Sequence, residues 1–142
     1  MKRLRTNRRV GFADCDPAKI VYYPRFYEWF DRSTESLFHS VAIDWVAMMG
    51  EDGWGGVFMG MPLVATEARY VAPCRYGDEI VIESWIDEIK GRTFTVRHDI
   101  HNHGRVVVEG REVRVWAVKD EAHPAGMRAV AMPDRVIRLF QD

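Results

Sequence analysis

A long helical segment that begins at Pro24 limits the folds open to this chain more than any other feature of the sequence. Proline is favoured in the first turn of a helix, where its missing N–H costs nothing. At about 100° per residue, one side of this segment is apolar and aromatic, and the other is charged. The apolar side comprises Phe26, Trp29, Phe30, Ser33, Leu37 and Val41, with Tyr27 and Phe38 at its edge. A helix this widely apolar needs a sheet to cover it.

Strand patterns lie on both sides of this helix in the sequence. One precedes it, over residues 4–13. Those that follow are rich in β-branched and aromatic residues and span 62–72, 79–89, 93–102 and 105–118. The short turns between them each contain a glycine: Gly77, Gly91 and Gly104. Long strands joined by short turns favour antiparallel pairing, so we expect the last three to be neighbours in one sheet.

The order of these elements predicts the fold class. One strand, one long covered helix and a run of antiparallel strands indicate an α+β fold, with a sheet of five to six strands wrapped around one central helix. Shorter helices are expected over residues 44–49, with Asp44 as N-cap, and from Pro133 to near Phe140. No repeat or linker interrupts the pattern, so residues 1–142 are expected to form one domain. The free edges of such a sheet favour pairing with a second copy.

Composition and charge exclude several classes of protein. The chain has 142 residues, of which 47% are hydrophobic and 29% charged, and a chain of this size can bury a core. The net charge of −1 gives no overall attraction to nucleic acid or to an anionic membrane. No apolar run reaches the length of a membrane helix, and none of signal-peptide length follows the basic start. We therefore expect a cytoplasmic protein with no nucleic-acid or membrane partner.

The cysteines and histidines do not form the pattern of a metal site. Cys15 and Cys74 are too few for a disulfide framework and wrongly spaced for zinc. His101 and His103 share one face of a strand but have no third ligand at a suitable spacing. His98 lies on the other face among apolar residues, so we interpret it as a buried, hydrogen-bonded imidazole. No metal and no cofactor are expected.

The segment just before the long helix carries the candidate chemistry. It reads Asp14-Cys15-Asp16-Pro17-Ala18-Lys19-Ile20-Val21-Tyr22-Tyr23-Pro24. A helix N-terminus presents unpaired N–H groups and about half a positive charge. With Asp16 close to it, such a site offers a hole for a developing oxyanion and an acid group to attack or activate water. Asp14 is interpreted as a turn or capping residue, and a turn-forming role is the plain alternative for Asp16.

This stretch resembles the signature of the 4-hydroxybenzoyl-CoA thioesterase family, D-x-D-P-A-G-x-V-x-Y-P followed by an aromatic helix. The resemblance continues through Arg25–Asp31 and to Met132-Pro133. It implies the hot-dog fold and hydrolysis of an acyl-CoA thioester. The family's catalytic carboxylate, a nucleophile or a base on water, corresponds to Asp16, and the tyrosine whose backbone N–H binds the thioester oxygen corresponds to Tyr23. Lys19 replaces the family's usual glycine, which costs ~1 kcal/mol if that position has a positive φ. If the glycine only gives room, Lys19 would instead narrow the cleft or reach a CoA phosphate.

The same resemblance implies substrate-binding residues. Lys90 and Arg92 occupy a hairpin that is basic in relatives and contacts CoA phosphates, and Arg128 is expected to add a phosphate contact from the same or a neighbouring subunit. Asp31 corresponds to a helix carboxylate that hydrogen-bonds the ring hydroxyl of a hydroxybenzoyl group, and Trp45 is expected to line that pocket. The plain alternatives are a solvated Asp31 and ordinary exposed hairpin charges.

Several functions stay open at this point. The acyl group is aromatic, as Asp31 suggests, or short and aliphatic. A thioesterase acting on an acyl carrier protein and a non-catalytic acyl-CoA-binding module are the alternatives. A hydratase on the same fold resembles a different pattern, with a histidine soon after the aspartate, whereas none follows Asp16 before His39. A homodimer or homotetramer is expected, with sites at the subunit interface.

Overall fold

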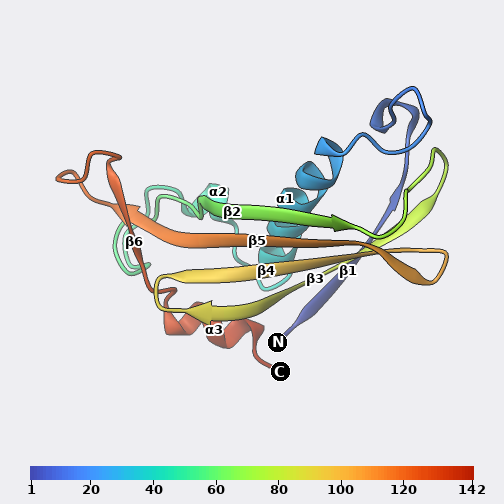
Figure 1. Cartoon of the computed structure of the whole chain (residues 1–142). Helices are drawn as coiled ribbons and strands as arrows, with labels where there is room; N and C mark the ends of the chain where they lie inside the picture. The colour runs from blue at the N-terminus through green and yellow to red at the C-terminus, as the bar shows by residue number, and fades with distance from the viewer.

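The computed structural model describes residues 1–142 and contains one antiparallel sheet with a long helix against one of its faces (Figure 1). The strands are β1 (Arg3–Arg9), β2 (Leu63–Tyr70), β3 (Glu79–Lys90), β4 (Thr93–Asn102), β5 (Arg105–Lys119) and β6 (Met127–Val130). The helices are η1 (Phe12–Asp14, a 3-10 turn), α1 (Pro24–His39), α2 (Trp45–Met48) and α3 (Asp134–Phe140). No helix combines the length and the apolar composition that a bilayer crossing requires.

The strand order is β1-β3-β4-β5-β2, and β6 pairs with the last residues of β5. The prediction that β3, β4 and β5 are antiparallel neighbours is confirmed. Two details differ from the expected strands. The first strand ends at Arg9 rather than at residue 13, because the chain leaves the ladder at Gly11 and enters η1. Strand β6 was not predicted, because its four residues are too few to show an alternating pattern.

Helix α1 buries the face predicted for it. Its buried residues are Phe26, Trp29, Phe30, Ser33, Thr34, Leu37 and Phe38. Val41 falls beyond the end of the helix, and Thr34 is an addition to the expected set. The helix lies very close to the sheet at Gly110, where an added Cβ would stand 2.4 Å from Phe30 Cζ. Glycine in β5 therefore allows the aromatic face of α1 to approach the strands.

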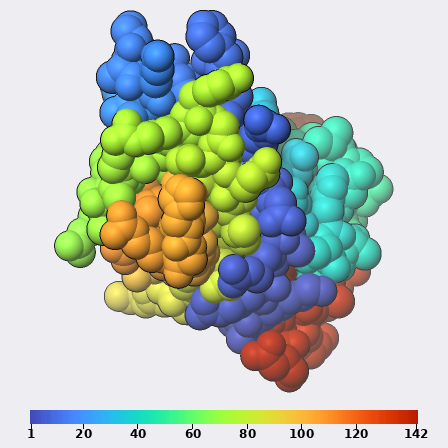
Figure 2. All heavy atoms as spheres, turned by 90° about the vertical axis from the view of Figure 1, so that its right-hand side faces the viewer, coloured from blue at the N-terminus to red at the C-terminus, as the bar shows by residue number.

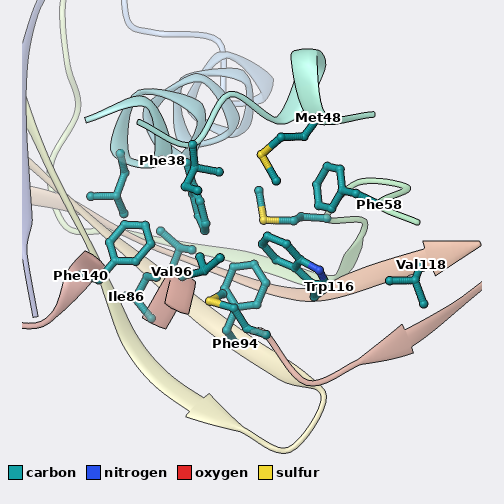
Figure 3. Close-up of a cluster of buried hydrophobic side chains, with 14 residues drawn as sticks. Phe38, Met48, Phe58, Ile86, Phe94, Val96, Trp116, Val118 and Phe140 are labelled. Atoms are coloured by element: carbon teal, nitrogen blue, oxygen red, sulfur yellow. The ribbon is translucent and has the colours of Figure 1, made fainter. Parts of the chain in front are cut away.

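The core lies between α1 and the sheet. Its larger cluster gathers residues from four separate elements: Phe38 from α1, Phe94 from β4, Trp116 from β5 and Phe140 from α3 (Figure 3). Each large side chain buried in this way contributes roughly 1.5–3 kcal/mol of hydrophobic stabilisation. The second cluster surrounds the first half of α1 and includes Trp29 and Phe30. The second cluster fixes the start of α1, from which the candidate site is built.

The short helices and turns follow the local sequence signals. Asp44 caps α2, since its Oδ1 accepts hydrogen bonds from the Val46 and Ala47 amides, both at 3.1 Å. Pro133 precedes α3, which ends at Phe140 as expected. The predicted turn glycines Gly77, Gly91 and Gly104 all have positive φ, the conformation that glycine adopts without steric cost.

Strand β2 is an exposed edge of the sheet. It pairs with β5 on one side and has no partner strand on the other. Seven of its eight residues are exposed, and they include the apolar Leu63 at 48% and Val64 at 60%. An edge strand with exposed apolar side chains is a ready surface for pairing with another chain.

Candidate active site

The candidate catalytic segment is a small hairpin that stands between β1 and α1. Its two arms are joined by backbone hydrogen bonds from Tyr22 N–H to the Asp14 carbonyl at 2.8 Å and from Asp16 N–H to the Ile20 carbonyl at 2.9 Å. The tip is a tight turn in which Lys19 N–H donates to the Asp16 carbonyl at 2.9 Å. Lys19 has a φ of 66°, so this position is left-handed, and lysine bears the steric cost of that conformation.

This hairpin is anchored to the segment that leads into β3. Val21 N–H donates to the Cys74 carbonyl at 2.8 Å, and Tyr76 N–H donates to the Lys19 carbonyl at 3.1 Å. In Figure 2 the blue hairpin projects at the top of the molecule beside the yellow-green chain that precedes β3. These main-chain bonds hold the Asp16 backbone in one place without using its side chain.

The Asp16 carboxylate is half-buried and only partly engaged. Its Oδ1 accepts a hydrogen bond from the Ala18 amide at 2.8 Å, which is an Asx turn. Its Oδ2 has no protein partner. Asp16 also lines a pocket of about 580 Å³, whose other walls are Phe12, Cys15, Pro17, Lys19 and Tyr76. The turn-forming role and a chemical role are therefore compatible, because each uses a different oxygen.

The first turn of α1 leaves one backbone donor free. Pro24 has no N–H, Arg25 N–H donates to the Tyr22 carbonyl at 2.9 Å, and Phe26 N–H donates to the Tyr23 carbonyl at 3.1 Å. The Tyr23 N–H has no acceptor in the structure. It stands where the partial positive charge of the helix dipole is greatest, so it can receive an oxygen that becomes negative.

Two neighbours of Asp16 have structural roles. Asp14 Oδ2 accepts a hydrogen bond from the Gly11 amide at 2.9 Å, which confirms the predicted capping role. Burial raises the pKa of the Cys15 thiol, and the charges of Asp14, Asp16 and Asp78 raise it further. A thiol with a raised pKa is a poor nucleophile at neutral pH.

Asp31 and Trp45, expected at the acyl end of the substrate, are brought together by Arg114. Arg114 Nη2 donates to Asp31 Oδ1 at 2.7 Å, and its guanidinium lies 5.7 Å from the centre of the Trp45 indole ring. Arg114 was not among the predicted site residues. The missed signal is that Glu112 and Arg114 occupy inward positions of a strand whose other inward residues include Val108 and Trp116.

The residues expected to bind phosphate, Lys90, Arg92 and Arg128, lie far from the Asp16 hairpin in the fold. Arg92 and Arg128 line one pocket of about 560 Å³, between the β3–β4 hairpin and β6. Arg128 Nε lies 3.6 Å from Asp120 Oδ2. Lys90 is exposed at the same hairpin but does not line this pocket. The Asp16 hairpin adjoins the start of β3, whereas Lys90 ends that strand, about 35 Å away for twelve extended residues.

His98 is buried, as predicted. Its Nδ1 lies 2.7 Å from Ser84 Oγ, and its Nε2 lies 2.8 Å from Glu112 Oε1. Phe30 stacks on the imidazole with a centroid separation of 4.9 Å. No three histidine, cysteine, aspartate or glutamate side chains gather closely enough to hold a metal ion.

Comparisons with known proteins place this geometry in context. A family model described as the thioesterase-like superfamily matches residues 10–140. The chain is 30% identical over 138 residues to 4-hydroxybenzoyl-CoA thioesterase of Pseudomonas sp. (strain CBS-3), with 93% of each chain covered.

Two solved structures extend the likeness to the fold. An aspartate-to-asparagine variant of 4-hydroxybenzoyl-CoA thioesterase in complex with 4-hydroxybenzoyl-CoA superposes with a TM-score of 0.87 at 28% identity, over 99% of this chain and 100% of that one. A gentisyl-coenzyme A thioesterase superposes with a TM-score of 0.79 at 27% identity, over 97% of this chain and 100% of that one.

Proposed function

The chain belongs to the thioesterase-like superfamily, and we propose that it hydrolyses the thioester of a hydroxylated aromatic acyl-CoA through Asp16. It has the hot-dog fold of its relatives, an antiparallel sheet against one long helix. The observation that carries the proposal is that the short segment leading into α1 holds two groups without a protein partner. Asp16 offers an unengaged carboxylate oxygen in a pocket, and Tyr23 offers an unengaged N–H.

The chemistry follows from these two groups. The thioester carbonyl accepts a hydrogen bond from the Tyr23 N–H, and the dipole of α1 stabilises the negative charge that develops on that oxygen. Asp16 then acts in one of two ways. As a base it takes a proton from water, which attacks the carbonyl; as a nucleophile it attacks directly and forms an anhydride that water cleaves. Either route releases the carboxylic acid and the CoA thiol.

The proposed acyl class has two supports. Relatives that cover almost the whole chain are named for 4-hydroxybenzoyl-CoA and gentisyl-CoA, both hydroxylated aromatic thioesters. Asp31 lies two turns, about 12 Å, beyond Tyr23 along α1. That separation is of the order spanned by a hydroxybenzoyl group with a hydrogen bond at each end. Trp45 supplies an aromatic surface close to the Asp31–Arg114 pair.

A homodimer is part of the proposal, because one chain does not bring all the candidate residues to one substrate. The hairpin before α1 lies at one end of the sheet, and the β3–β4 turn and β6 lie at the other (Figure 1). Asp16 belongs to the first of these segments, and Arg92 and Arg128 belong to the last two. Antiparallel pairing of β2 with β2 of a second copy turns one sheet by a half rotation relative to the other. This places the basic end of each chain toward the Asp16 end of its partner and covers the exposed Leu63 and Val64.

The acyl class is tested by thiol release from a panel of thioesters. The panel contains 4-hydroxybenzoyl-CoA, gentisyl-CoA, benzoyl-CoA, a short aliphatic acyl-CoA and a hydroxybenzoyl acyl carrier protein. The proposal predicts the highest kcat/KM for a hydroxylated aromatic CoA ester. Preference for the aliphatic ester refutes the acyl class, and preference for the carrier protein refutes CoA as the carrier. Binding without turnover of any ester indicates a non-catalytic module.

The shared site is tested by mixing two inactive variants. One carries Asp16→Asn, and the other carries Arg92→Glu together with Arg128→Glu. If the arginines act across the dimer, a mixed dimer contains one site with an intact Asp16 and intact partner arginines, so exchange of subunits restores activity. If all groups act within one chain, mixing restores nothing, and the dimer model is wrong.

A further inference from the structure

A continuous chain of buried polar groups connects the centre of the sheet to Asp31. Its members in order are Ser84, His98, Glu112, Arg114 and Asp31, with Thr34 of α1 donating to Glu112. The side chains of His98, Glu112 and Arg114 are 0%, 2% and 6% exposed. Such a network is expensive to bury, and apolar replacements of buried ion pairs are often as stable or more so. Fold stability therefore gives no sufficient reason for its presence.

The network is built to fix the position of Arg114. Its Nη1 donates to the Met61 carbonyl at 2.8 Å, and its Nη2 donates to Glu112 Oε2 at 2.7 Å. Glu112 is itself fixed, because its Oε1 receives hydrogen bonds from His98 and Thr34. The guanidinium is thus held by Glu112 of its own strand and by the loop that precedes β2, in addition to its contact with Asp31.

The contact with Arg114 engages only one of the two carboxylate oxygens of Asp31. Arg114 Nη2 binds Asp31 Oδ1 at 2.7 Å, and Asp31 Oδ2 has no protein partner. The Asp31 side chain is 58% exposed, so an unanchored carboxylate there would rotate freely in solvent. With Oδ1 held by Arg114, whose guanidinium lies 5.7 Å from the centre of the Trp45 ring, Oδ2 is left as an oriented acceptor.

We propose that Arg114 is a specificity-determining positioning residue that orients the Asp31 carboxylate to accept the ring hydroxyl of the acyl group. This inference rests on the proposed function. Arginine suits the task because its rigid planar fork bonds Met61, Glu112 and Asp31 at once, which a lysine ammonium at the end of a flexible stem cannot do. The buried groups behind it serve to hold that fork in register.

The test compares two substrates that differ only in the hydroxyl. The kcat/KM ratio of 4-hydroxybenzoyl-CoA to benzoyl-CoA is measured for the wild type, Arg114→Lys and Arg111→Lys. Arg111 is the matched control, because it lies on the same strand with its side chain on the opposite face. We expect Arg114→Lys to reduce the ratio about tenfold or more, the effect of losing a charge-assisted hydrogen bond, and Arg111→Lys to leave it unchanged.

Two further variants protect the test against a folding defect. The double variant Glu112→Gln with Arg114→Met removes both buried charges, so neither is left unpaired. Its kcat/KM ratio of 4-hydroxybenzoyl-CoA to benzoyl-CoA is expected to fall as far as that of Arg114→Lys. In an Asp31→Asn background, Arg114→Lys is expected to change the ratio no further. Circular dichroism and thermal unfolding report whether each variant is folded.

The outcomes separate this inference from the function beneath it. If wild type hydrolyses no hydroxylated aromatic CoA ester of the panel, the proposed function fails and the inference falls with it. If wild type prefers the hydroxylated ester and the folded Arg114 variants keep that preference, only the inference is overturned. An equal loss of kcat/KM for both esters also overturns it, since a merely structural role moves both substrates alike.

Discussion

Replacing Glu112 by glutamine is predicted to weaken the dependence of the free energy of unfolding on pH in the acid range. Burial alone would raise the pKa of the Glu112 carboxyl, but the hydrogen bond and charge of His98, the charge of Arg114 and the Thr34 hydroxyl outweigh it. Together they lower the pKa from 4.5 to about 2. Because the folded pKa lies below the unfolded one, this group stabilises the fold fully above pH 4.5 and loses that effect as pH falls toward 2.

The size of the effect follows from the pKa difference of about 2.5. At about 1.4 kcal/mol for each tenfold change, the fold with ionised Glu112 is about 3 kcal/mol more stable at pH 7 than the same fold with this carboxyl protonated. About 2 kcal/mol of this is lost by pH 3, because the unfolded carboxyl is then protonated while the folded one is still mostly ionised.

The assay is urea unfolding followed by tryptophan fluorescence, since Trp29 and Trp116 are buried. Wild type, Glu112→Gln and the exposed control Glu88→Gln are compared between pH 7 and pH 3. The stability gap between wild type and Glu112→Gln is expected to be largest at pH 7 and to narrow by about 2 kcal/mol at pH 3. Glu88→Gln should follow the wild type throughout. A gap for Glu112→Gln that does not change with pH would refute the reasoning.

Two other predictions concern the backbone. Gly110→Ala is expected to lower the free energy of unfolding by about 1–3 kcal/mol, because the new Cβ would stand 2.4 Å from the Phe30 ring. Denaturant titration measures this loss, with Gly11→Ala as the control, since a Cβ at Gly11 meets Asp14 Oδ2 at 3.4 Å. A loss for Gly110→Ala no greater than that for Gly11→Ala would contradict the close packing of Phe30 on β5. Lys19→Gly is expected to raise stability by up to about 1 kcal/mol, and Lys19→Val to lower it, since φ is 66°; the opposite order in the same titration would show that the turn is not strained.

Much of the fold could be predicted because local sequence patterns determine it. The two-sided periodicity after Pro24 predicted the buried face of α1, and turn glycines such as Gly91 located the ends of the long strands. The Asp44 cap and the buried His98 also follow from their immediate neighbours. Such features need no knowledge of distant contacts.

Features that depend on distant pairing were not predicted. The place of β2 beside β5 is set by the way the sheet closes over α1, and β6 gains its identity only from its pairing with β5. Thr34 reads as a polar helix residue until Glu112, 78 residues away, is placed beside it. A role for Arg114 at the candidate site likewise could not be predicted before its contact with Asp31 was known.

The residues of the candidate site also fall into those that local sequence predicts and those that depend on distant contacts. Asp16 and Tyr23 belong to one short segment, so their neighbourhood could be predicted from the motif. Lys90, Arg92 and Arg128 were predicted as phosphate ligands, but their distance from Asp16 depends on the three-dimensional course of the strands. The roles of these residues stay predictions.

The central claim is that the Asp16 carboxylate performs the chemistry, and the most direct measurement is kcat at saturating 4-hydroxybenzoyl-CoA for wild type, Asp16→Asn and Asp14→Asn. The account predicts that Asp16→Asn loses about 100-fold or more in kcat, as expected for a lost acid–base group. Its substrate should still bind, because the Tyr23 N–H and the Asp31 carboxylate are unchanged. Asp14→Asn should retain most of the activity. An Asp16→Asn variant as fast as the wild type would contradict the account.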